Sequence, residues 1–491
     1  MNVPGTNNTK EESYSFMGGQ QAIKGARGRI DFTAGQPWKK IIVFALPLML
    51  SNLLQQLYNT VGSIIVGRGV SHVGLAAVGL AGPYLRVLTS LFMGVAMGGN
   101  VLVAQQYGAK DKAGLRRTVH SAIVLSITVG LTLSVIGIVL APFILKWTSV
   151  PDEVYPMALT YMRILFAGIV FQMTYNMLAS FLRGMGNSHT QLIILIISSI
   201  ANIILTWVFV IYFKWGVAGS GYALFISQLL SVVIIFFYLQ RNEWTRISLK
   251  ELKLHAAETK ELLRIGLPTA VQQVVMSLAG MIVMGYITTY GTETIAGYSA
   301  GNTIDMYIQM PIQSLNMSVT PFAAQNVGAG KMDRVRTAAK QVVLINTGIN
   351  LVISAAVLIF SRSLLGLFTV NAATIAAGTV MLRCIVPTNI LSAINQPLSG
   401  VIRGSGDPVT PMINSLMMVV VIRIPVIILL NRTFGRIEVV YFSQAISYFY
   451  GIIHILIVYN KGKWKKRALA RIEALKRAAS ESAETEAEKV I

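Results

Sequence analysis

The sequence has little charge and almost no cysteine. Only 12% of its 491 residues are charged, against about 25% in an ordinary soluble domain, while 54% are hydrophobic and the mean hydropathy is +0.62. A soluble globular fold is therefore excluded, and an integral membrane protein is expected. The single cysteine, Cys384, rules out a disulfide within the chain, a cysteine-based zinc site and a redox pair of thiols. The five histidines are too scattered along the chain to form a metal cluster.

Long hydrophobic runs fill most of the sequence. About 20 apolar residues are enough for a helix to cross the hydrocarbon of a bilayer. Twelve segments meet this length, near residues 41–66, 75–104, 118–145, 156–182, 189–213, 216–239, 262–288, 295–323, 338–361, 376–402, 409–432 and 436–459. Each is expected to be an α-helix, because lipid offers the backbone no hydrogen-bond partner. Residues 1–40 lack the basic start and apolar core of a signal peptide, so no cleaved leader is expected.

The net charge of +21 is distributed unevenly between the two sides of the membrane. With both termini in the cytoplasm, the loops and tails on that side hold 31 of the 41 Lys and Arg residues. When residues at the span ends are counted with the adjoining loops, the outer loops hold 6 and the interiors of the spans hold 4. The positive-inside rule therefore predicts a multi-pass protein of the inner (cell) membrane with both termini cytoplasmic. Since the basic excess reports topology and contact with anionic membrane lipids, no nucleic-acid partner is expected.

Four short motifs recur at a spacing of 220 or 221 residues. The pairs are ALP at 45–47 with GLP at 266–268, AQQYGA at 104–109 with AQNVGA at 324–329, YMR at 161–163 with MLR at 381–383, and LRGMGN at 182–187 with IRGSGD at 402–407. The chain is thus predicted to be a duplication. Its expected parts are a polar tail (1–37), an N-lobe with spans 1–6 (38–239), a charged cytoplasmic linker (240–265), a C-lobe with spans 7–12 (266–460) and a final tail (461–491).

Because each half has an even number of spans, both halves enter the membrane from the same side. The fold expected is all-α, with two parallel six-helix lobes related by a pseudo-two-fold axis along the membrane normal. This architecture is typical of alternating-access transporters with a site near the midplane. The AQ(Q/N)xGA and RGxG(N/D) motifs are interpreted as a helix end and a tight turn. Pro47, Pro268 and Pro311 lie within spans and are candidate hinges or gates.

The repeated motifs resemble those of one known family. ALPLMLSNLLQQLYNTVGSIIVGR, VAQQYGAKDKAGLRR, SFLRGMGNS, GLPTAVQQ, TPFAAQNVGAGK and GVIRGSGDP are similar to segments of the multidrug and toxic compound extrusion (MATE) transporters, part of the multidrug/oligosaccharidyl-lipid/polysaccharide (MOP) flippase superfamily. The resemblance covers about residues 37–460. It implies an inner-membrane antiporter that exports organic compounds against H+ or Na+, with no enzymatic activity and no other cofactor.

The sequence departs from this family at its coupling-ion sites. One branch of the family has an Asp in the first helix and an Asn-x-x-x-Asp pair in the fifth, where this chain has Gly62, Asn202 and Thr206. A second branch has a Glu in the seventh helix and an Asp in the tenth, where this chain has Met276 and no acid. Of these groups only Asn202 can be carried over, so neither cation site is expected to be intact.

Asp305 is the one acid in the interior of a predicted span, away from the tails, the loops and the span ends. An Asp at the centre of a membrane helix costs about 2.5–3.5 kcal/mol on insertion scales, so a cavity or a partner is expected. Two hypotheses stay open. In the first, Asp305 carries the coupling proton as its surroundings alternate between wet and dry. In the second, Asp305 forms a fixed ion pair with Arg86. The residue equivalent to Asp305 in the N-lobe is Leu85, and Arg86 is its neighbour in the sequence.

Neutral polar residues in the spans are candidates for binding the substrate. These are Gln55, Gln56, Asn59, Asn302, Gln309, Asn389, Asn395 and Gln396. Four arginines against one acid within the spans favour a neutral or anionic small molecule as cargo. A monomer is expected. Trp464, Leu469, Ile472 and Leu475 are spaced on one face of a basic helix predicted to lie on the inner leaflet, with an acidic, disordered end after it.

Two other functions remain as alternatives. A lipid-linked-precursor flippase of the same superfamily shares the two-lobe design, although flippases tend to add further helices. An integral-membrane enzyme is the more remote reading. One intramembrane acid and scattered histidines provide neither a metal site nor a pair of groups for acid–base catalysis.

Overall fold

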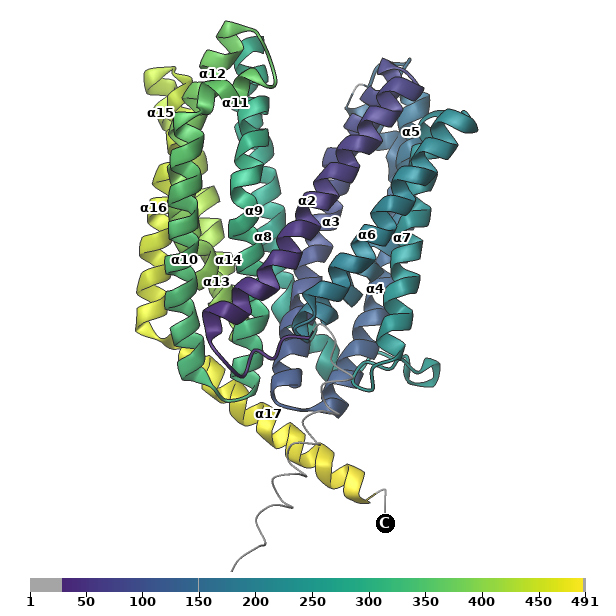
Figure 1. Cartoon of the computed structure of the whole chain (residues 1–491), viewed down its shortest axis with the longest axis vertical. Helices are drawn as coiled ribbons and strands as arrows, with labels where there is room; N and C mark the ends of the chain where they lie inside the picture. Colours follow the sequence, from purple (N-terminus) through teal and green to yellow (C-terminus); the bar gives the residue numbers. More distant parts are fainter. Residues whose placement is uncertain (1–28, 149, 489–491) are drawn as a thin grey trace, which may run out of the picture.

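The computed structural model describes residues 29–148 and 150–488, and almost all of them are helical (Figure 1). The first half contains α2 (Pro37–Gly69), α3 (His72–Gly108), α4 (Lys112–Trp147), α5 (Tyr155–Gly184), α6 (Ser188–Trp207), a π-helical turn (Val208–Tyr212) and α7 (Gly216–Gln240). The second half contains α8 (Ala256–Thr288), α9 (Thr292–Gly328), α10 (Met332–Ile359), α11 (Ser361–Gly366), α12 (Ala372–Ile385), α13 (Thr388–Gly404), α14 (Val409–Leu416), a π-helical segment (Met417–Arg423), α15 (Ile424–Phe434) and α16 (Ile437–Lys461). The last described helix is α17 (Lys463–Glu488), and a short 3₁₀ turn, Leu249–Glu251, lies in the linker.

Every predicted span falls on a helix or on consecutive helices. Among the described residues, ten spans are long and apolar enough to cross a membrane, and α12 with α13 makes an eleventh, bent by 44°. The bend is at Val386–Pro387, where proline interrupts the helical hydrogen bonding. The twelfth predicted span is α9, whose 37 residues are sufficient in length but include Asp305 and several amides. The predicted all-α fold with two lobes is confirmed.

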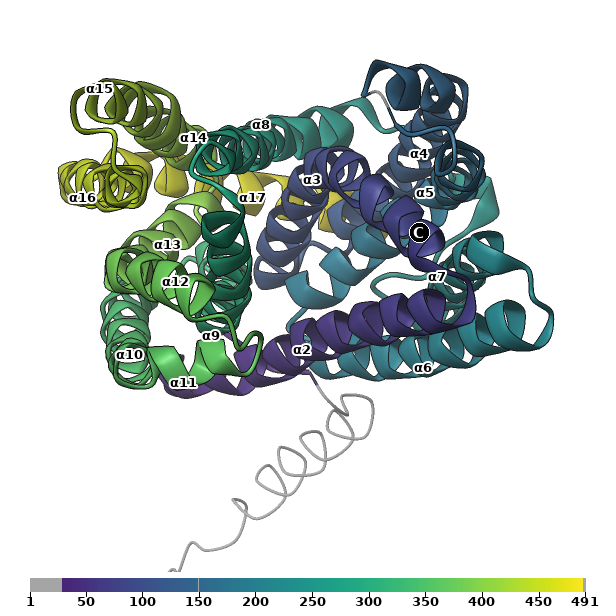
Figure 2. The ribbon, with the colours of Figure 1, turned by 90° about the horizontal axis from the view of Figure 1, so that it is seen from above.

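The two lobes meet at one end of the molecule and diverge toward the other (Figure 1). We call these the closed end and the open end. Viewed from above, α2 runs from α9 of the C-lobe to α6 of the N-lobe (Figure 2). Its first turns bury Phe44 and Leu48 in a cluster with Phe322 of α9. Its repeat equivalent, α8, packs correspondingly against α3 of the N-lobe. Each lobe's first helix therefore begins against the opposite lobe.

The candidate hinge prolines lie within these long helices. Pro47 is inside α2, Pro268 inside α8 and Pro311 inside α9, and each helix is continuous through its proline. Because α2 and α8 cross between the lobes, Pro47 and Pro268 are placed where a relative movement of the lobes would bend them. Their role as hinges stays a prediction.

The RGxG motifs form the tight turns that the sequence predicts. Gly186 and Gly406, at equivalent positions, have φ of +80° and +90°, which side chains with a Cβ rarely adopt. In the first turn, Asn187 begins α6 by accepting a hydrogen bond at its Oδ1 from the Thr190 N–H, at 3.0 Å. In the second, Asp407 accepts one from the Thr410 N–H, at 3.3 Å.

The C-terminal helix differs from its prediction. α17 passes beneath the closed end, where it contacts both α9 and α4 (Figure 1). Trp464, Ile472 and Leu475 are buried, whereas Leu469 is 53% exposed. Most of the predicted lipid-facing residues therefore pack against the protein, because the ends of the lobes offer them an apolar surface. The helix also continues through Glu488, so the acidic end predicted to be disordered is helical as far as that residue.

Candidate substrate and ion sites

Two equivalent hydrogen bonds join the lobes at the closed end. Gln105 of α3 donates from Nε2 to the Gly404 carbonyl at 3.1 Å, and Gln325 of α9 donates from Nε2 to the Gly184 carbonyl at 2.6 Å. Donors and acceptors are repeat equivalents at 220 residues. The motifs interpreted only as a helix end and a turn thus also connect the lobes. We call this pair of hydrogen bonds the glutamine latch.

Glycines allow the helices to approach closely beside the latch. A Cβ on Gly108 would lie 2.0 Å from the Gln325 carbonyl oxygen, and a Cβ on Gly328 would lie 2.0 Å from the Gln105 carbonyl oxygen. Both contacts involve backbone atoms, so no side-chain movement would relieve them. The closed end is therefore symmetric in its packing as well as in its hydrogen bonds.

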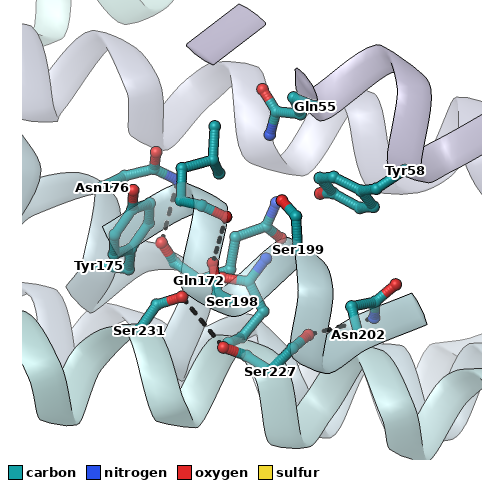
Figure 3. Close-up of a pocket in the computed structure, with 12 residues that line it drawn as sticks. Gln55, Tyr58, Gln172, Tyr175, Asn176, Ser198, Ser199, Asn202, Ser227 and Ser231 are labelled. Atoms are coloured by element: carbon teal, nitrogen blue, oxygen red, sulfur yellow. Dashed lines mark hydrogen bonds between the residues drawn. The ribbon is translucent and has the colours of Figure 1, made fainter. Parts of the chain in front are cut away.

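The N-lobe contains a small polar pocket (Figure 3). Gln55 and Tyr58 of α2 face the other polar residues across it. Its remaining lining is Gln172, Tyr175 and Asn176 of α5, Leu195, Ser198, Ser199 and Asn202 of α6, and Ser227, Gln228 and Ser231 of α7. Its volume of about 40 Å³ suits a few water molecules or one inorganic cation. No carboxylate is among these lining residues.

Several polar groups of this pocket are already hydrogen bonded, within their own helix or to a neighbouring one. Asn202 donates from Nδ2 to the Ser227 hydroxyl at 3.2 Å, and Ser231 donates to the Ser227 carbonyl at 3.0 Å. The Ser199 hydroxyl is buried and has no hydrogen-bond partner among the described residues. Neither Gly62 nor Thr206, where the family's acids were expected, lines the pocket. The pocket can therefore offer neutral oxygens to a ligand but no negative charge.

A larger pocket adjoins the small one. It shares Gln55, Gln172, Asn176 and Gln228 with the small pocket and adds Asn59 together with apolar residues such as Met93 and Phe225. Its volume of about 440 Å³ lies within the range of pockets for small organic molecules, roughly 300–1,000 Å³. The N-lobe thus has a space of substrate size next to a space of ion size.

The C-lobe has a different polar centre, built around Asp305 of α9. Asn389 of α13 donates from Nδ2 to the Asp305 carboxylate at 2.6 Å, and Gln309 donates from Nε2 to Asn389 at 2.7 Å. The structure therefore brings together three predicted site residues. Among the described side chains, Asp305 takes part in no ion pair within 4.0 Å.

A second chain of hydrogen bonds begins beside Asn389. Gln444 of α16 donates from Nε2 to the Thr388 hydroxyl at 3.1 Å. The guanidinium of Arg423 in turn donates to Gln444 at 3.0 Å, and its Nε is buried without a partner among the described residues. The acid and the arginine thus belong to two separate hydrogen-bonded groups, which adjoin at the consecutive residues Thr388 and Asn389.

The remaining predicted residues are separated in space. Gln55, Asn59 and Asn202 line the N-lobe pockets. Asn395 is buried in the C-lobe and accepts from Asn414, which contacts His454, while Gln396 accepts from Asn316. Gln56 and Asn302 line neither N-lobe pocket and make no hydrogen bond with the Asp305 group. The side chain of Arg86 lies outside the described residues, so its pairing with Asp305 stays a prediction.

Several pocket residues were missed from the sequence. Gln172 with Asn176, and Ser227 with Ser231, are spaced four residues apart, so each pair lies on one face of its helix. Polar pairs at this spacing within an apolar span indicate a polar helix face, and they could have predicted these pocket residues. The glutamine latch could also have been found from the sequence, because its donors, Gln105 and Gln325, and its acceptors, Gly404 and Gly184, all lie in repeated motifs.

Comparisons with known proteins agree with this architecture. The sequence model of the MatE family matches residues 47–208 and again residues 268–429, once in each lobe. The chain belongs to the MATE family of multidrug efflux transporters. The double match also supports the duplication inferred from the motifs.

Several relatives of this MATE protein match almost its whole length. The probable multidrug resistance protein YoeA of Bacillus subtilis (strain 168) is 30% identical over 448 residues, or 89% of this chain and 96% of the relative. The multidrug export protein MepA of Staphylococcus haemolyticus (strain JCSC1435) is 24% identical, over 90% of this chain and 98% of the relative. A solved multidrug resistance MATE transporter in an outward-facing conformation has a TM-score of 0.80 at 24% identity, over 91% of this chain and 98% of that one.

Family membership decides between the functions left open by the sequence. The protein is a multi-pass membrane transporter, and the alternative of a lipid-linked-precursor flippase receives no support from relatives with these names. Membership in a transporter family also implies that the protein is not an enzyme.

Proposed function

We propose that this MATE protein is a proton-coupled antiporter that exports a neutral or anionic organic compound, with Asp305 as the proton carrier. The observation that carries the proposal is the setting of Asp305. It is the one acid away from the ends of the predicted spans, and its described partner is the neutral amide of Asn389 rather than a cation. A carboxylate fixed by an arginine would keep its charge, whereas one bound by an amide is free to take up a proton.

The orientation of the molecule follows from its basic residues. Lys112, Arg116 and Arg117 lie at the start of α4 by the closed end, and α17 with its basic residues passes beneath that end. We place the closed end and both termini in the cytoplasm of a cell whose inner membrane the protein spans. The open end then faces outward, and the conformation is the one that releases cargo.

The chemistry of the larger N-lobe pocket supports the class of cargo. Its polar groups are amides and a threonine hydroxyl, and no acidic residue lines it to attract an organic cation. Apolar residues such as Leu165, Leu224 and Phe225 provide the remaining contact surface. Such a lining suits a partly apolar molecule that accepts and donates hydrogen bonds.

Sodium coupling is a second candidate, favoured by the small N-lobe pocket. Its hydroxyl and amide oxygens are ligands suited to a hard cation. In that case the coupling ion would bind next to the cargo, and Asp305 would have only a structural role.

Transport in proteoliposomes distinguishes these possibilities. We expect uptake of a neutral or anionic compound to be driven by an imposed proton gradient and to be independent of Na+. Uptake driven by Na+ at constant pH would favour the N-lobe pocket as the ion site. Transport of organic cations such as ethidium, without transport of neutral or anionic compounds, would contradict the proposed cargo.

A further inference from the structure

The glutamine latch is symmetric in its donors but not in what holds its two amides. The Oε1 atom of Gln105 accepts a hydrogen bond from Nε of Arg471 in α17, at 3.0 Å. The Oε1 atom of the equivalent Gln325 is buried and has no partner among the described residues. The C-terminal helix therefore supports one half of the latch and not the other.

Arginine determines which way the amide of Gln105 points. A guanidinium only donates hydrogen bonds, so the atom that faces Arg471 must be the amide oxygen. The NH₂ group of Gln105 is then directed to the Gly404 carbonyl, the contact that joins the lobes. Without Arg471 the orientation of this amide would depend on its contact with the Gly404 carbonyl alone, as that of Gln325 depends on the Gly184 carbonyl.

α17 is attached mainly to the C-lobe. Trp464 is fully buried, stacks on Tyr459 with ring centroids 5.1 Å apart, and donates from its indole N–H to the Tyr459 carbonyl at 3.0 Å. Arg467 forms an ion pair of 2.6 Å with Asp407, which is 2% exposed and lies in the second RGxG turn. These contacts fix the helix before it reaches the N-lobe.

Arg471 is also held on its other side. Its NH1 lies 3.2 Å from Glu261 in the first turns of α8. Burial lowers the pKa of the Arg471 guanidinium and Glu261 opposes that effect, and an arginine side chain stays charged under physiological conditions. A charged donor forms a stronger hydrogen bond with Gln105 than a neutral one would.

We propose that Arg471 is a positioning residue for transport: by orienting Gln105 it stabilises the shut closed end, so that α17 acts as a strap across the two lobes. The inference rests on the alternating access in the proposed function but not on the identity of cargo or ion. Opening of the closed end requires the Arg471–Gln105 hydrogen bond to break.

Distances between spin labels on the purified full-length protein test the proposal without cargo or gradient. With Cys384 replaced by serine, labels at Lys146 and Arg362, exposed near the open ends of the N-lobe and C-lobe, report the separation of the lobes. We expect Arg471→Gln to raise the ratio of the short-distance to the long-distance population about tenfold, as loss of one charged hydrogen bond implies. Arg477→Gln, an exposed arginine on the same helix, should leave the distribution unchanged.

Two further variants separate positioning of Gln105 from mere attachment of the helix. Arg467→Gln removes the ion pair with Asp407 but does not touch Gln105, so a smaller shift than that of Arg471→Gln is expected. Gln105→Leu should shift the distances as Arg471→Gln does, and the double variant should shift them no further. An unchanged distribution in Arg471→Gln, an equal shift in Arg467→Gln, or additive shifts in the double variant would each overturn the proposal. These outcomes are independent of transport, so they do not depend on whether Asp305 carries protons.

Discussion

The two lobes share their fold and their contacts at the closed end, but not their polar interiors. Gln105 and Gln325 play equivalent roles, as do Gly108 and Gly328. In contrast, the N-lobe positions equivalent to Asp305 and Asn389 hold Leu85 and Ile169. The N-lobe instead has a pocket of neutral amides, hydroxyls and tyrosines.

The contrast indicates where a duplicated transporter needs its symmetry. The surfaces by which the lobes meet must fit each other in a shut state, and equivalent helix ends fit by the same geometry. The interior of each lobe has no such constraint, so one lobe can specialise in a titratable group and the other in an uncharged pocket. The three predictions below test this division, beginning with the largest expected effect.

Loss of the carboxylate should abolish coupling in the C-lobe. Asp305→Asn keeps the side-chain shape and a group that accepts from Asn389, so the variant should fold and reach the membrane. It cannot carry a proton, and gradient-driven transport should fall by about 100-fold or more, a loss typical of a group essential to proton transfer. Transport driven by a proton gradient and cargo counterflow, measured on the same proteoliposomes, check this, because counterflow should persist.

Asp333→Asn is the matched control, since Asp333 is 98% exposed on α10. The competing hypothesis of an ion pair with Arg86 makes a different prediction. Asp305→Asn would then leave the guanidinium unpaired, which for a fully buried pair costs about 3–5 kcal/mol of stability. Adding Arg86→Gln would restore expression and transport together. Proton-driven transport by that double variant at the wild-type rate would remove Asp305 from the coupling mechanism.

The fold was predictable from the sequence to a much greater degree than the sites. Apolar runs and repeated motifs determine the number of helices and their pairing, because a bilayer leaves the backbone few alternatives. Which polar residues meet depends on helix rotation. Thus Asp305, Gln309 and Asn389 were all predicted, but their grouping was not. Tyr58 and Ser199 were missed, because a single polar residue in an apolar span can face either a pocket or a neighbouring helix. The position of α17 was mispredicted, since an amphipathic face does not reveal whether protein or lipid covers it.

Breaking the symmetric packing should affect both lobes alike. Gly108→Val and Gly328→Val would each place a side chain against backbone of the opposite lobe, where a Cβ would meet a carbonyl oxygen at 2.0 Å. Overpacking of this kind typically costs about 1–3 kcal/mol, and here it should be relieved by separation of the closed end. Thermal unfolding in detergent and the spin-label distances check this.

The control is Gly348→Val on α10, where a Cβ would meet no atom within 4 Å. The two interface variants are expected to lower the free energy of unfolding by amounts that agree within about 0.5 kcal/mol, the scale within which the effects of independent sites add. If Gly108→Val destabilised the protein and Gly328→Val did not, the two halves of the closed end would contribute unequally to stability despite their equivalent contacts.

The smallest effect is expected in the N-lobe, and it decides between the two coupling ions. The Ser199 hydroxyl has no partner among the described residues, so Ser199→Ala should change the free energy of unfolding by no more than about 0.5 kcal/mol. Ser134→Ala is a close match as a control, because that hydroxyl in α4 is also buried and without a partner among the described residues but lies away from the pocket.

With Asp305 as the proton carrier, both variants should retain proton-driven transport. If instead Na+ binds among the neutral oxygens, Ser199→Ala should weaken stabilisation of the protein by Na+ in thermal unfolding, whereas Ser134→Ala should not. If stabilisation by Na+ differed between the Ser199→Ala and Ser134→Ala variants, the coupling ion would be assigned to the uncharged N-lobe pocket instead of Asp305 in the C-lobe, and the proposed division of roles would be reversed.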